Sequence, residues 1–309
     1  MNGKKLSSSL ILLLTAAIWG FAFVAQKTGM EFIGPFTFNA CRFTIGASCV
    51  LGFSLLMDMR KKSAEGSVEH PYFVEKKPNK ILFTAGILCG ASLFIGSSLQ
   101  QVALQFTTVS KCSFVTALYM VIVPLLSVLL KKKIPVNAWV GVFLSAIGFY
   151  FLCLLPGELS MNWGDFLTLL GSLFWAVQIL VIDHFVNKTD GIKIAAIQFI
   201  ITALFSIIFA LILETFTFAD IAASAIPILY GGFLSVGVAF TLQIVGQKHT
   251  PPTLASLILS LESVFAVVGG AIILNESLTG RESFGCLLIF IGVLLAQIPI
   301  QNFIKRKKV

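Results

Sequence analysis

Glu262 is an acidic residue in the middle of an apolar run that extends from residue 251 to residue 273. A carboxylate at the centre of a membrane-spanning helix costs roughly 2.5 to 3.5 kcal/mol on insertion scales, so Glu262 should face protein or a water-filled cavity. Two interpretations stand side by side. The carboxyl group either exchanges protons with solvent or holds the amine of a substrate, or it is a neutral glutamic acid that hydrogen-bonds a neighbouring helix.

Arg42 is a second charged residue inside an apolar run, which covers residues 36–57. It lies one to two helical turns from one end of this run, with Asn39 three residues before it. A long side chain in this position can reach the membrane interface while its stem stays among apolar groups. The alternative is recognition of a carboxylate or phosphate on a substrate, which a guanidinium group binds through two parallel hydrogen bonds.

Trp19 and Trp175 lie near the middle of apolar runs, whereas tryptophan in membrane proteins is enriched at the interfaces. Gln178 follows Trp175 by one helical turn, on the same helix face. Such a set supplies an apolar wall and a neutral hydrogen-bonding group for a polar small molecule. Tight packing between helices is the alternative. Aromatic and glutamine side chains near span ends often contact only headgroups or neighbouring helices, and this alternative applies to three further candidates: Tyr119, Gln100 and Gln243.

The motifs of other functional classes are missing from the sequence. There is no GxxxxGK[ST] phosphate loop, no HExxH zinc motif and no GxSxG nucleophile elbow, so neither ATP hydrolysis nor a familiar hydrolase chemistry is indicated. The six cysteines form no CxxC pair, and the three histidines are scattered, so we expect no metal and no cofactor. The net charge of +8 comes from short basic clusters between apolar runs, which is not the pattern of a nucleic-acid-binding protein.

The composition indicates an integral membrane protein. Hydrophobic residues make up 57% of the chain and charged residues only 12%, against roughly 25% charged residues in soluble domains. Apolar runs of about 20 residues recur, each long enough to cross a hydrocarbon core about 30 Å thick, and they lack the alternation of a β-barrel. We therefore predict an all-α protein with ten transmembrane helices, at 7–26, 36–57, 81–102, 108–130, 135–155, 163–183, 192–213, 224–246, 251–273 and 282–302.

The basic residues predict the orientation, because loops rich in lysine and arginine are retained in the cytoplasm. Eighteen of the 22 basic residues fall on the side that holds both termini, and three fall on the other side. The first side includes a basic loop at 58–80 and the basic tail after the last span. The sequence thus predicts a multi-pass protein of the cytoplasmic membrane with both termini in the cytoplasm.

The second half of the sequence resembles the first at a shift of roughly 143 to 156 residues. Trp19 lines up with Trp175, and the segment 113–119 lines up with 256–262, which places Tyr119 opposite Glu262. Two pairs of glycines also align, Gly141 with Gly285 and Gly148 with Gly292. Residues 1–155 and 156–309 would each contain five spans. Because five is odd, the two repeats must be inverted, an arrangement typical of transporters with a site near the bilayer midplane.

Three segments resemble one family. At Trp19-Gly20, at 35–42, and at 261–266 followed by 274–278, the chain resembles an EamA-type transporter of the drug/metabolite transporter superfamily. The resemblance extends over nearly the whole chain. It implies two inverted five-helix repeats, a central cavity between them, and transport, often export, of small organic metabolites.

These observations predict a secondary transporter that moves a small organic metabolite, an amino acid or a similar molecule, by alternating access. Its expected partners are this small-molecule substrate, the lipid bilayer and, as a hypothesis, protons exchanged at Glu262. Export is the expected direction. A selective channel or facilitator is the alternative, and an integral membrane enzyme is a more distant one. The sequence does not identify the substrate, the coupling ion or the oligomeric state.

Overall fold

The computed structural model describes residues 3–64, 80–153, 162–273 and 279–297. Within these residues the chain is helical and contains no strand. The first half holds α1 (Gly3–Gly29), α2 (Pro35–Ala64), α3 (Lys80–Ala103), α4 (Val109–Ala117), α5 (Tyr119–Leu129) and α6 (Val136–Cys153). The second half holds α7 (Trp163–Phe185), α8 (Gly191–Leu213), α9 (Phe218–Ala223), α10 (Ala225–Leu229), the π-helix η1 (Tyr230–Phe240), α11 (Thr241–Gln247), α12 (Pro252–Leu259), α13 (Glu262–Ile273) and α14 (Gly280–Gln297).

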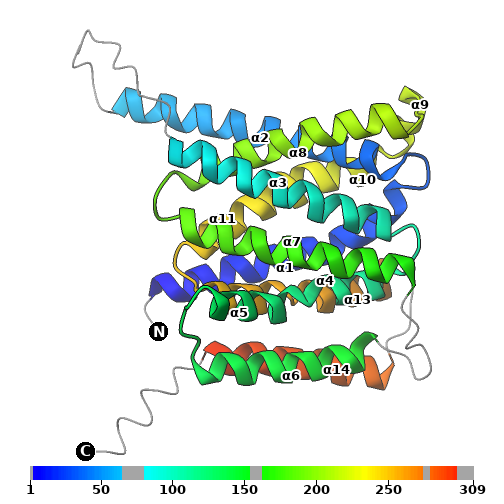
Figure 1. The fold of residues 1–309 in the computed structure, drawn as a ribbon. Coiled ribbons are helices and arrows are strands. Elements are labelled where there is room, and N and C mark those ends of the chain that lie inside the picture. The colour runs from blue at the N-terminus through cyan, green and yellow to red at the C-terminus, as the bar shows by residue number, and fades with distance from the viewer. Residues whose placement is uncertain (1–2, 65–79, 154–161, 274–278, 298–309) are drawn as a thin grey trace, which may run out of the picture.

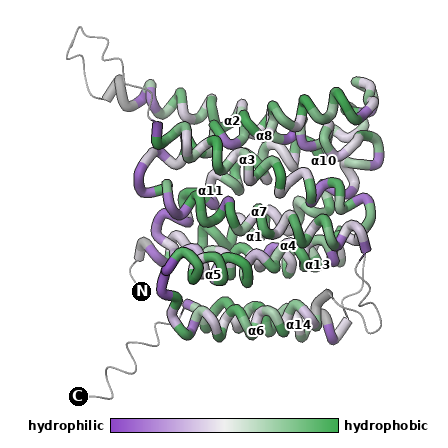
Figure 2. The backbone as a smooth tube through the Cα atoms, viewed as in Figure 1, coloured by the Kyte–Doolittle hydropathy of each residue, from purple (hydrophilic) through white to green (hydrophobic). Residues whose placement is uncertain are grey.

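The helices run side by side in one bundle, with α2 and α8 packed together at one edge and α6 and α14 packed together at the opposite edge (Figure 1). The first helix begins, and α14 ends, at the same end of the bundle. Apolar residues cover the length of the helices, and polar residues gather at the two ends (Figure 2). This distribution suits a bundle whose sides face lipid and whose ends face water.

Eight stretches of the described chain are long and apolar enough to cross a membrane, which agrees with an integral membrane protein. Shorter apolar helices at Val136–Phe151 and Ser283–Gln297 correspond to the two remaining expected spans, 135–155 and 282–302. Both of these spans extend beyond the described residues, and ten crossings stay a prediction. Most of the expected basic loop at 58–80, the basic tail and the segment 274–278 also lie outside the described residues.

Three expected spans are not continuous α-helices. The span at 108–130 is interrupted at Leu118, whose N–H bonds to the Val115 carbonyl three residues back, at 3.2 Å. The span at 251–273 is interrupted between α12 and α13, where the Leu261 N–H makes the same kind of bond to the Ile258 carbonyl at 3.2 Å. The span at 224–246 contains the π-helix, a form that is frequent at functional sites. The hydropathy pattern does not reveal these interruptions, because the apolar run continues through them.

Candidate functional site

A small cavity, with a volume of about 30 Å³, lies inside the bundle. Its walls contain all eight residues that the sequence analysis singled out: Trp19, Arg42, Gln100, Tyr119, Trp175, Gln178, Gln243 and Glu262. The remaining wall residues were not among those candidates: Ala22, Phe23, Gln26, Thr116, Ile179, Ser235 and Phe240. Residues that are far apart in the sequence therefore line one cavity, which the helix packing creates.

Glu262 is the first residue of α13, directly after the interruption of its span, and it is only 4% exposed. Tyr119 is the first residue of α5, directly after the corresponding interruption at Leu118, and its hydroxyl donates to Oε1 of Glu262 at 3.0 Å. Contact of Tyr119 with headgroups is wrong, since its side chain is buried in the cavity wall, whereas contact with a neighbouring helix is confirmed by the bond to Glu262.

Arg42 does not extend to the membrane interface, so that interpretation is wrong. The residue is 2% exposed and lines the cavity. Its Nε donates to Oδ1 of Asn39 at 2.9 Å, and its guanidinium carbon lies 4.9 Å from the ring centre of Phe43 and 5.7 Å from that of Phe38. Aromatic ring faces attract a cation, so the two rings stabilise the guanidinium group inside the bundle.

The two tryptophans of the aligned positions flank one phenylalanine. The ring centre of Phe240 lies 4.6 Å from that of Trp19 and 5.8 Å from that of Trp175. Nε1 of Trp19 donates to the Ser235 carbonyl at 3.3 Å, whereas Nε1 of Trp175 is buried without a hydrogen-bond partner. The rings line the cavity and also pack between helices, whereas a role of the two tryptophans in substrate binding stays a prediction.

The glutamines of the cavity are buried, and two of them, Gln178 and Gln243, bond to each other. Nε2 of Gln243 donates to Oε1 of Gln178 at 3.0 Å, and Nε2 of Gln178 has the oxygens of Gln243 and Gln198 within 3.4 Å. Nε2 of Gln100 donates to Oγ1 of Thr116 at 3.1 Å. Contact of Gln100 and Gln243 with headgroups is therefore wrong, whereas contact with neighbouring helices, the other alternative, is confirmed. Such a network can exchange its internal bonds for bonds to a polar ligand.

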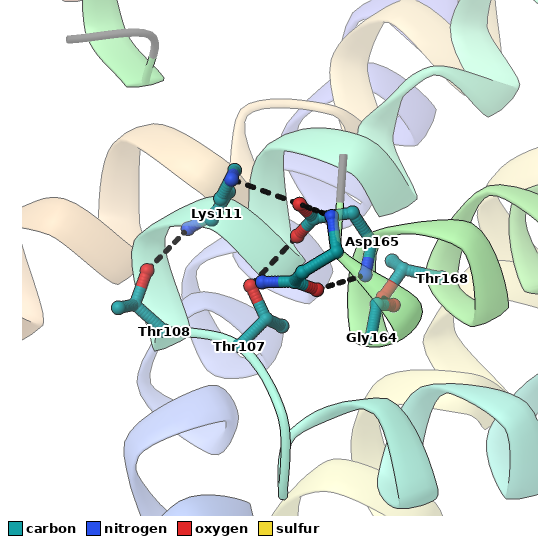
Figure 3. Close-up of polar contacts among 7 residues, drawn as sticks. Thr107, Thr108, Lys111, Gly164, Asp165 and Thr168 are labelled. Carbon is teal, nitrogen blue, oxygen red and sulfur yellow. Dashed lines mark hydrogen bonds and ion pairs between the residues drawn. The ribbon is translucent and has the colours of Figure 1, made fainter. Parts of the chain in front are cut away.

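A polar cluster holds the helices together at the end of the bundle opposite to the start of α1. Figure 3 shows Lys111 and Thr107 directed at Asp165, the third residue of α7. Lys111 Nζ lies 2.8 Å from Oδ2 of Asp165, and Oγ1 of Thr107 donates to Oδ1 at 2.8 Å. Asn162 and Asp165 also form the capping box of α7. The cluster connects the start of α4 to the start of α7 and was not foreseen from the sequence, because Asp165 and Lys111 each read as a charge at a span end.

Phe240 and Gln26 are two wall residues that the sequence analysis missed. They differ in whether the sequence gives a reason to select them. Phe240 is one of 29 phenylalanines, and its neighbours in the sequence give no reason to choose it. Gln26 is a polar residue at the end of an apolar run, and its Oε1 is buried without a hydrogen-bond partner. The same reasoning that selected Gln100 would have selected Gln26.

An all-helical bundle of membrane-spanning length, with a polar and aromatic cavity inside it, is the architecture of a membrane transporter. The EamA-like transporter family matches residues 6–154 and 162–297, and the chain belongs to this family.

Curated relatives agree with this assignment, and a solved structure shares the fold. An uncharacterized transporter of Archaeoglobus fulgidus is 31% identical over 96% of this chain and 88% of its own length. The uncharacterized transporter YoaV of Bacillus subtilis is 25% identical over 90% of this chain and 92% of its own. A crystal structure with 18% sequence identity superposes with a TM-score of 0.76 over 96% of this chain and 98% of its own, which shows that the fold is shared.

Proposed function

We propose that this protein is a secondary transporter that exports a small organic metabolite, an amino acid or a similar molecule, by alternating access through the cavity. The observation that carries the proposal is the gathering of Glu262, Arg42, two tryptophans and several glutamines around one cavity. Polar groups inside a membrane bundle are costly and usually mark a substrate or ion pathway. Since the sequence contains no phosphate loop for ATP, a gradient supplies the energy.

Two inverted five-helix repeats, 1–155 and 156–309, form part of the proposal. The glycine contacts between α6 and α14 support it. Suppose that Gly141 corresponds to Gly285 and Gly148 to Gly292. A two-fold axis that exchanges the repeats then turns a contact between Gly141 and Gly292 into a contact between Gly285 and Gly148. A Cβ atom added to Gly141 would lie 2.6 Å from the Gly292 carbonyl oxygen, and one added to Gly148 would lie 2.7 Å from the Gly285 carbonyl oxygen.

The interrupted helices support alternating access. Discontinuous helices at the interface between repeats are a recurring feature of transporter sites. Here the interruptions at Leu118 and Leu261 precede Tyr119 and Glu262, so the hydrogen-bonded pair lies where the backbone of both spans is already irregular. The basic residues on the side of the termini support the proposed location in the cytoplasmic membrane with both termini inside.

Glu262 is the proposed proton-coupling residue. The test is uptake of a radiolabelled panel of amino acids and metabolites into proteoliposomes, with and without an imposed pH gradient. Gradient-driven accumulation should be lost in Glu262→Gln, which keeps the shape of the side chain but cannot exchange a proton. Glu31→Gln is the matched control, because Glu31 is exposed between α1 and α2.

Each result decides a different part of the proposal. Unchanged gradient-driven accumulation in Glu262→Gln would make Glu262 structural and leave the transporter in place. Flux that neither saturates nor shows competition would favour a channel. Absence of uptake for the whole panel would contradict the proposed function.

A further inference from the structure

Arg42 is a buried cation that has no anionic partner among the described residues. The ion pairs in this part of the chain involve Lys111, Lys132 and Lys193. Arg42 contacts only neutral groups, the side-chain oxygen of Asn39 and two phenylalanine rings. A buried charge without a partner is strongly unfavourable, so an anion is expected to complete this site at some stage of the transport cycle.

The neighbourhood of Arg42 holds the guanidinium group in place and leaves its ends available. Asn39 accepts from Nε, so Nη1 and Nη2 are the donors that remain for a ligand. Gly231 contributes no side chain on the facing π-helix, where an added Cβ atom would already lie 3.4 Å from Cδ of Arg42. A guanidinium fork with both ends available binds a carboxylate through two hydrogen bonds.

Unsatisfied donors nearby point to the same chemistry. Nδ2 of Asn39 is buried without a hydrogen-bond partner, and Oδ1 of the same amide is already used by Arg42, which fixes the amide orientation. Nε1 of Trp175, in the cavity wall, is also buried without a partner. Buried donors without acceptors are rare in native proteins, and an acceptor oxygen of a ligand in the cavity would satisfy Nε1 of Trp175.

Glu262 limits the charge of such a ligand. It lines the same cavity, and its only side-chain hydrogen bond among the described residues comes from the Tyr119 hydroxyl. A ligand with several negative charges would be repelled by an ionised Glu262, whereas a single carboxylate would be neutralised by Arg42. We infer that the transported molecule carries one carboxylate group and that this group binds to Arg42. The inference rests on the proposed transport function.

The experiment compares ligands that differ only in the carboxylate. Uptake into proteoliposomes and quenching of tryptophan fluorescence are measured for three sets of compounds. These are amino acids, their amides, in which a neutral amide group replaces the carboxylate, and the corresponding amines that lack the carboxyl group. The expected result is uptake and binding of the carboxylates, with an affinity at least about tenfold higher than for the amides. Quenching is informative because Trp19 and Trp175 both line the cavity.

The variants test whether Arg42 is the residue that binds the carboxylate. Arg42→Gln should remove the preference for acids over amides, and Arg42→Lys should keep part of it, because an ammonium group retains the charge but not the fork. Arg60→Gln is the matched control, since Arg60 is an exposed residue of the same helix. Size-exclusion profiles identify a variant that does not fold, and the comparison of ligands on the unmodified protein needs no variant.

The possible outcomes separate this inference from the transport function. Equal uptake of acids and amides, or an unchanged acid preference in Arg42→Gln, would overturn the inference while the transporter stands. If affinity depends on chloride and not on the ligand's carboxylate, Arg42 binds an inorganic anion and the inference is also overturned. If the unmodified protein takes up no member of the panel, the transport function itself fails.

Discussion

The hydroxyl of Tyr119 donates a hydrogen bond to Oε1 of Glu262 at 3.0 Å, between residues that are 143 positions apart. The two residues occupy corresponding positions in the aligned halves of the sequence, each directly after an interruption of its span. A proton acceptor from one half is thus bonded to a donor from the other. A substitution at either residue should therefore affect both halves of the protein.

Tyr119→Phe should lower gradient-driven uptake severalfold and reduce thermal stability. The substitution keeps the ring but removes the donor, and a hydrogen bond to a charged group contributes about 1.5 to 3 kcal/mol. Tyr150→Phe is the control, because Tyr150 is exposed on α6. Uptake in proteoliposomes and thermal unfolding in detergent measure the two effects. If Tyr119→Phe and Tyr150→Phe behave alike, the bond to Glu262 has no functional role.

Phe240→Leu should weaken ligand binding about threefold to tenfold, because an aromatic contact contributes roughly 0.5 to 1.5 kcal/mol beyond the area that it buries. Phe240 packs against both Trp19 and Trp175, so its loss should also change the tryptophan emission. Phe233→Leu, on the exposed side of the same π-helix, should leave both unchanged. Fluorescence titration measures binding. Equal affinities for the two variants would contradict a role of the aromatic wall in binding.

Gly148→Ala should destabilise the protein, whereas Gly52→Ala should not. A Cβ atom at position 148 would lie 2.7 Å from the carbonyl oxygen of Gly285 and 2.8 Å from the amide nitrogen of Ile289, so the backbones of α6 and α14 must separate. Overpacking of this kind costs about 1 to 3 kcal/mol. At Gly52 no atom lies within 4 Å of the added Cβ, and alanine favours the helix. Thermal unfolding checks both, and equal melting temperatures would mean that α6 and α14 do not pack closely.

Asp165→Asn should destabilise the protein far more than Asp183→Asn. Asp165 is 3% exposed and pairs with Lys111, and removal of one partner from a buried ion pair costs about 3 to 5 kcal/mol. Asp183 is 21% exposed and pairs with Lys132, which is 42% exposed, so its pair contributes about 0 to 1 kcal/mol. The melting temperatures of the two variants give the comparison. A larger loss in Asp183→Asn would show that the cluster around Asp165 does not hold the helices together.

Reporter fusions should separate ten crossings from eight. If α6 crosses the membrane, seven spans precede Phe216, and alkaline phosphatase fused after this residue is exported and active. If α6 and α14 do not cross, six spans precede it and the same fusion is inactive. The 18 residues of α6 extend over about 27 Å, close to the hydrocarbon thickness, and support the first result. Green fluorescent protein fused after Val309 should fluoresce in either case, and its failure to do so would contradict the proposed orientation.

The sequence by itself determined the membrane class, the places of the long apolar helices and a set of polar residues within them. These properties are local. The bilayer penalises every polar group that it meets, so a span can be recognised from its own residues, and a residue such as Glu262 stands out against an apolar background. The roles of the selected residues stay predictions, although one cavity contains them all.

The tertiary structure decided what each polar side chain contacts. Arg42 can reach either an interface or the interior from the same helical position, and only the rings of Phe38 and Phe43 and the adjacent cavity determine that it turns inward. The position of Phe240 between two tryptophans depends on how distant helices pack, and so does the pairing of Tyr119 with Glu262. Contacts between distant segments leave no local signature in an apolar run, because lipid-facing and core-facing residues there are chemically alike.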